Sequence, residues 1–104
     1  MDVVFDLATA HLVPFAVRGD ACLFAREDAA AFVVACQREE RPILGIECYR
    51  DDNQGPTLLP EPMADFSSLA STPHQEWVRR SCHEALHFIR SVVPVHALCE
   101  FVLG

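Results

Sequence analysis

The sequence predicts a single α+β domain spanning residues 1–104, with helices packed on a small mixed sheet. Apolar residues recur at helical spacing in three segments, and short apolar, β-rich runs lie between them. Pro and Gly separate these segments, and no repeat or linker divides the chain. With 104 residues, 51% of them hydrophobic, the chain can bury a core without disulfides. The predicted order of elements is α-β-α-β-β-α-β.

The N-terminal third is predicted to contain a helix, a turn and a strand. Apolar positions in the first dozen residues follow helical spacing, and Pro14 ends that helix. Gly19 and Asp20 form a turn. The run Ala21–Ala25 then forms a short buried strand.

A second helix and the strongest strand follow. Glu27 and Asp28 open the helix, because negative charge suits the positive end of the helix dipole. Pro42 stops it, after an apolar stripe of Ala29, Phe32, Val33 and Cys36. The strand Ile43–Tyr49 is mostly apolar, as an interior strand is. Because a helix joins it to the preceding strand, we expect a right-handed crossover and parallel pairing.

The next strand is expected to be short and antiparallel. Residues 51–55 form a turn, and Thr57–Leu59 returns beside the previous strand. Pro60 and Pro62 cut this strand off, because proline cannot donate to a strand ladder. The ten residues that follow are expected to form an irregular loop.

A long helix and a final strand complete the domain. Thr72 is expected to cap the helix, which runs to about Val92. Residues Val95–Leu103 alternate in character, which predicts a strand. One face of this strand is apolar, and the other carries His96 and Glu100.

Charge and hydropathy exclude two classes of partner. The net charge is −7, with every positive residue an Arg, so the surface repels nucleic acid. No stretch approaches the roughly 18 uninterrupted apolar residues of a membrane span. Asp2 stands where a secretion signal would carry positive charge, so no signal is expected.

The five cysteines predict a reducing compartment. Their number is odd, they form no C-x-x-C pair, and each has apolar neighbours. We expect them to be reduced core residues and the protein to be cytoplasmic. They are Cys22, Cys36, Cys48, Cys82 and Cys99.

One motif suggests catalysis. Residues 83–87 read HEALH, which matches the H-E-x-x-H signature of zinc peptidases. In such a site His83 and His87, one helical turn apart, bind zinc, and Glu84 is the general base. The third ligand is missing at its usual place, which is Val93 here, although Glu100 could substitute.

The predicted orientation of this motif favours a solvated helix face over a metal site. On a wheel of 100° per residue, His83 and His87 lie about 140° and 180° from the core position Val78. Neighbouring positive charge would lower metal affinity. The arginines on that side are Arg79, Arg80 and Arg90. The prediction is therefore no metal and no enzyme, with a zinc peptidase as the alternative.

Acidic residues around the loops are the candidate partner-binding site. Asp51 and Asp52 lie in one predicted turn, and Glu61 and Asp65 lie beyond the following strand. Acidic clusters of this kind either are solvated or steer a basic partner into place. Glu47 lies inside the strongest strand, where we expect it to point to a solvated face of the sheet. The alternative is that it is buried with a partner such as an Arg.

Three segments resemble a known family. PILGIECYRDD (residues 42–52) is similar to a strand-and-turn pattern of small bacterial immunity proteins, the family numbered forty in polymorphic toxin systems. EWVRRSCHEALHFI (residues 76–89) looks like that family's helix, and ACLFAREDAAAFV (residues 21–33) fits its strand-then-acidic-helix layout. The resemblance implies a cytoplasmic, non-enzymatic protein that occludes a cognate toxin. A basic toxin would suit the net charge of −7. An oligomerising domain without another ligand is a further alternative.

Overall fold

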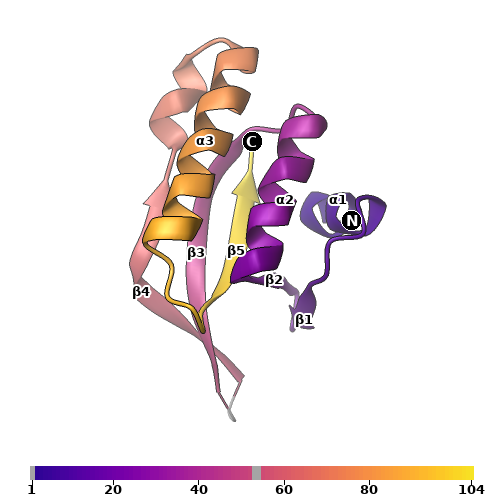
Figure 1. Ribbon diagram of the computed structural model, residues 1–104, viewed down its shortest axis with the longest axis vertical. Helices are drawn as coiled ribbons and strands as arrows, with labels where there is room; N and C mark the ends of the chain where they lie inside the picture. Colours follow the sequence, from indigo (N-terminus) through magenta and orange to yellow (C-terminus); the bar gives the residue numbers. More distant parts are fainter. Residues whose placement is uncertain (1, 53–54) are drawn as a thin grey trace.

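The structure, a computed structural model, describes residues 2–52 and 55–104 and confirms the α+β class (Figure 1). Within those residues the helices are α1 (Val3–Ala10), α2 (Arg26–Arg38), α3 (His74–Ser91) and the short 3-10 helix η1 (Ser67–Ser71). The strands are β1 (Ala16–Arg18), β2 (Ala21–Ala25), β3 (Ile43–Asp52), β4 (Gly55–Asp65) and β5 (Leu98–Leu103). The sequence prediction missed the short strand β1 and the helix η1.

The strands form one antiparallel sheet in the order β1-β2-β5-β3-β4. The predicted parallel pairing of β2 with β3, and with it a mixed sheet, is wrong. Strand β5 lies between them and pairs antiparallel with both. Strands β2 and β3, which α2 connects, do run in the same direction. They are not neighbours, because the C-terminal strand β5 lies in the space between them.

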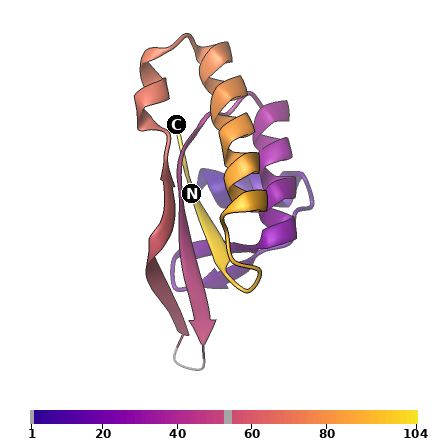
Figure 2. The same cartoon turned by 60° about the vertical axis from the view of Figure 1, so that its left-hand side comes forward.

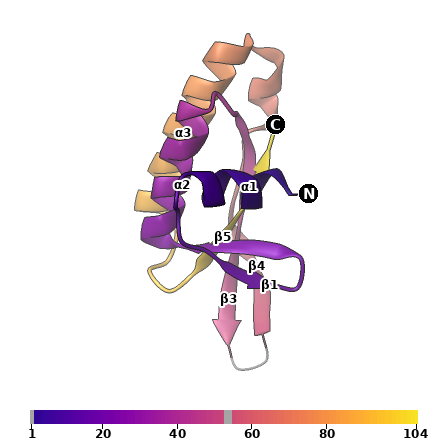
Figure 3. The ribbon, with the colours of Figure 1, turned by 90° about the vertical axis from the view of Figure 1, so that its right-hand side faces the viewer.

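Helices α2 and α3 cover one face of the sheet, and the main core lies beneath them (Figures 1 and 2). An aromatic cluster forms its centre. The ring of Phe32 lies 4.6 Å from that of Phe24 and 4.7 Å from that of Phe101, measured between centroids. Helix α1 packs against α2 and β5, and it crosses in front of them in Figure 3. Strands from both ends of the chain thus share one core.

Strand β4 is longer than predicted because it is an edge strand. It continues through Pro60 and Pro62 to Asp65. Cys48 pairs with Leu59 while its neighbour Glu47 pairs with Met63, so residues 60–62 bulge from the ladder. An edge strand tolerates proline because its outer side needs no N–H donor.

The start of α3 also differs from the prediction. The hydroxyl of Thr72 donates to the carbonyl of Leu69 at 2.6 Å, so it closes η1 and does not cap α3. At the other end the helix stops at Ser91, with Val92 as its C-cap, which agrees with the predicted end at about Val92. Val92 is therefore 47% exposed, and Val93, at 4%, packs in the core instead.

Candidate functional site

The H-E-x-x-H motif lies on the outer side of α3. His83, Glu84 and His87 are all exposed, whereas Cys82 and Ala85 of the same helix are buried. The predicted orientation of the two imidazoles is confirmed. Sequence alone sufficed here because helical periodicity determines which side of a helix faces the core.

The candidate third ligand, Glu100, does not approach His83 and His87. It alternates along β5 with Cys99 and Phe101, which are buried under the helices. Its side chain therefore points to the opposite face of the sheet. In the part of the chain that the structure describes, no three His, Cys, Asp or Glu side chains are grouped to hold a metal ion.

The face of the sheet opposite α2 and α3 is the most distinctive surface. On its β3–β4–β5 part, the outward side chains point away from α2 and α3 (Figure 2). We call the outward side chains of these strands the open face. Strand register arranges them in three rows, each running from β5 through β3 to β4. The rows are Val102–Gly45–Asp65, Glu100–Glu47–Met63 and Leu98–Tyr49–Leu58.

Two carboxylates meet at the centre of the open face. Glu47 and Glu100 stand directly opposite one another on neighbouring strands, an arrangement in which like charges destabilise a sheet. The Tyr49 hydroxyl donates to Oε1 of Glu100 at 2.7 Å. That hydrogen bond, together with burial, raises the pKa of Tyr49 above its ordinary value. Glu47 makes no hydrogen bond or ion pair with any residue that the structure describes.

Exposed apolar side chains surround these carboxylates. Met63 is 57% exposed, Leu58 49% and Val102 45%. Exposed apolar patches mark surfaces that bind another protein, and such interfaces also contain hydrogen-bonding groups. The open face therefore combines both kinds of contact that a protein interface uses.

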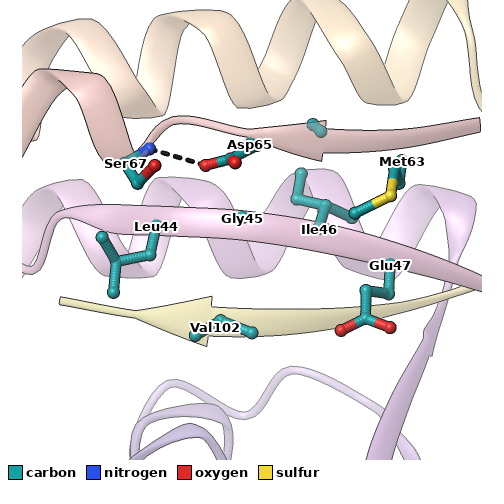
Figure 4. A pocket seen from close by; sticks show the side chains of 9 residues that line it. Leu44, Gly45, Ile46, Glu47, Met63, Asp65, Ser67 and Val102 are labelled. Atoms are coloured by element: carbon teal, nitrogen blue, oxygen red, sulfur yellow. Dashed lines mark hydrogen bonds between the residues drawn. The ribbon is translucent and has the colours of Figure 1, made fainter.

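A hollow of about 270 Å³ lies in the first row, at Gly45 (Figure 4). Gly45 has no side chain to fill its place between Val102 and Asp65. A Cβ there would lie 2.8 Å from the carbonyl oxygen of Ala64, so the close approach of β3 and β4 requires glycine. The hollow is thus built into the backbone of the sheet.

Asp65 borders this hollow from β4. The backbone N–H of Ser67 donates to its Oδ1 at 2.9 Å. Hydrogen bonds from Ser67 lower the pKa of Asp65 below its usual value because they stabilise the charged carboxylate.

The four acidic residues predicted from sequence do not form one cluster. They are spread along the β3–β4 hairpin, and only Asp65 lies beside the hollow. The Arg18 guanidinium donates a hydrogen bond of 3.2 Å to Oδ2 of Asp51. This bond connects β3 to the β1–β2 hairpin, which crosses the strands in Figure 3. Glu61 is exposed in the bulge of β4. Asp52 ends β3, and its side chain lies outside the described residues.

Sequence reasoning missed Glu100 as a candidate binding residue. It placed Glu47 and Glu100 on outward sheet positions, which the structure confirms. It did not bring them together, because the signal depends on β5 being the neighbour of β3. An outward carboxylate in each of two strands indicates a shared binding site only when the strands are known to pair.

Comparisons with protein-family models, with curated proteins and with solved structures find no match to this chain. Among the described residues, no helix combines the length and apolar character needed to cross a membrane. The resemblance to immunity proteins therefore depends on the short motifs alone, and the cytoplasmic location stays a prediction.

Proposed function

We propose that this protein is a non-enzymatic immunity protein, which binds a basic toxin through the open face and neutralises it by occlusion. The resemblance of its strand and helix motifs to immunity proteins supports the toxin as partner. The neighbouring gene is the expected source of that toxin, because immunity proteins of this kind are encoded beside their targets.

The observation that carries the proposal is the pair of facing carboxylates, Glu47 and Glu100, on the face of the sheet opposite α2 and α3. In the free protein their repulsion opposes folding, by roughly 0.2–1 kcal/mol for such pairs. An Arg or Lys of a partner placed between them would turn this repulsion into attraction. The two carboxylates are thus more favourably placed when a cationic group of a partner is bound than when the protein is free.

Occlusion needs no chemical step from this chain. The net charge of −7 accelerates encounter with a basic protein through long-range attraction. Exposed apolar side chains such as Met63 and Val102 then supply area that becomes buried in the complex. A toxin whose active cleft is covered in this way loses access to its substrate.

Co-expression with the neighbouring gene product tests the proposal. We expect that product to be toxic alone, harmless beside this protein, and recovered with it as a stable complex. Glu47→Gln with Glu100→Gln should weaken the complex by tenfold or more, about 1.4 kcal/mol per factor of ten.

Glu84→Gln is the matched control, since Glu84 is exposed on α3 and is the general base of the alternative zinc peptidase. It should leave protection unchanged. A neighbouring product that is not toxic, or that does not bind, contradicts the proposal. Loss of protection in Glu84→Gln alone, with bound zinc, would favour the peptidase.

A further inference from the structure

The hollow at Gly45 has a defined shape and a mixed lining. Leu44, Met63 and Val102 supply apolar surface around it. In Figure 4 Asp65 lies along β4 and Glu47 reaches toward β5, with Gly45 between them. The hollow therefore offers apolar walls and two carboxylates from different strands.

The two carboxylates are diagonal neighbours. Glu47 pairs with Met63, and Asp65 pairs with Gly45, two positions away on each strand. Diagonal neighbours on one sheet face are about 7–8 Å apart at the backbone, within reach of a single group lying between them. A cationic group suits this position, because the two charged residues that line the hollow are both acidic.

The size of the hollow suits one long side chain. Sites for drug-sized molecules and cofactors enclose roughly 300–1,000 Å³. This hollow, at about 270 Å³ and open to solvent, is smaller. A long side chain with an apolar stem and a charged end matches its walls and its two carboxylates.

We propose that this hollow is a socket for an arginine side chain of a protein partner, an inference that rests on the proposed function. Arginine fits better than lysine because its planar guanidinium donates in several directions at once and is weakly hydrated. It can donate to Glu47 and Asp65 together while its stem lies against Met63. A charge-assisted hydrogen bond to each carboxylate then fixes its position.

A small probe tests the socket without the toxin. Amide resonances of the labelled full-length protein are followed by NMR during titration with Nα-acetyl-arginine N-methylamide. We expect saturable shifts centred on Gly45, Met63 and Val102. The matching citrulline compound has nearly the same shape without the charge and should produce no saturable shift.

Three variants locate the binding. Glu47→Gln and Asp65→Asn should each weaken the arginine probe about tenfold, the effect of losing a hydrogen bond to a charged group. Glu61→Gln removes a charge from the same strand outside the hollow and should change nothing. Amide spectra of the variants establish that each remains folded.

Three results would overturn the socket. They are a titration without saturation, equal shifts with the citrulline compound, and a Glu61→Gln effect equal to that of Glu47→Gln. The result of the probe titration can be distinguished from the result of the test of the proposed function. Saturable binding of the probe with no binding of the neighbouring gene product supports the socket and contradicts the immunity role. The reverse pattern contradicts the socket alone.

Discussion

The two faces of the sheet are made from alternate residues of the same strands, yet they differ in almost every property. In β5, Cys99 and Phe101 are buried under the helices, at 0% and 4% exposure. Their neighbours Glu100 and Val102 point to the open face, where Glu100 meets Glu47. Residues that stabilise the fold are thus separated from those available for binding by one position along the chain.

The largest predicted difference between the faces is in stability. Phe32→Ala should lower the free energy of unfolding by about 3–5 kcal/mol, because it empties the centre of the aromatic cluster. Met63→Ala on the open face should lower it by about 0.5 kcal/mol or less. Urea denaturation measures both values. Similar losses for the two variants would contradict the separation of the faces.

The covered face should also be the source of sensitivity to alkali. Burial raises the pKa of Cys22 and Cys82 from 9.0 to about 11. Unfolded thiols ionise at the lower value, so their contribution to stability is present below pH 9 and is lost as the pH rises toward 11. The denaturation midpoint should fall across this range.

Cys22→Ala with Cys82→Ala provides the control for this pH effect. The double variant should show a flatter profile from pH 9 to pH 11. An unchanged profile would mean that other groups, such as Tyr49, account for the loss. In the native protein at neutral pH the cysteines should resist alkylation, since all five are buried and free.

On the open face, removing a charge should raise the stability of the fold, whereas the changes on the covered face described above lower it. Glu47→Gln removes the repulsion with Glu100 and should raise the free energy of unfolding by about 0.2–1 kcal/mol. The same change should weaken partner binding. Glu84→Gln, on the solvated side of α3, should leave stability unchanged. A destabilised Glu47→Gln variant would show that Glu47 has a structural partner.

The smallest effect is expected at the rim of the open face. Arg18→Ala breaks the contact with Asp51, a surface ion pair in which the two side chains are 43% and 30% exposed. The loss of stability should be a few tenths of a kcal/mol, and added salt should remove it. Thermal unfolding at low and high salt measures this difference. A loss that persists in high salt would indicate packing by the Arg18 stem.

Much of the fold was predictable because it depends on local pattern. The apolar stripes predicted α2 and α3, and the same periodicity placed His83 and His87 in solvent. Strand neighbours were not predictable. Nothing in residues 21–49 indicates that β5 will lie between β2 and β3.

The candidate site was predicted only in part for the same reason. Asp65 belongs to the hollow, but Asp51 already has Arg18 as its partner, 33 residues earlier in the chain. The meeting of Glu47 with Glu100 depends on pairing across 53 positions of sequence, and no spacing rule gives it. Strand order and register determine which side chains are neighbours on the face of a sheet, and neither could be predicted from the sequence here.

The most direct test of the open face uses two matched valines. Val102 on the open face is 45% exposed, and Val34 on the outer side of α2 is 39% exposed. Affinity for the neighbouring gene product is measured for Val102→Arg and for Val34→Arg. We predict that Val102→Arg weakens the complex by roughly a hundredfold or more, since it puts like charge against a basic partner, and that Val34→Arg binds as tightly as the unmodified protein. Equal affinity for both variants, or loss in Val34→Arg alone, would contradict docking through the open face.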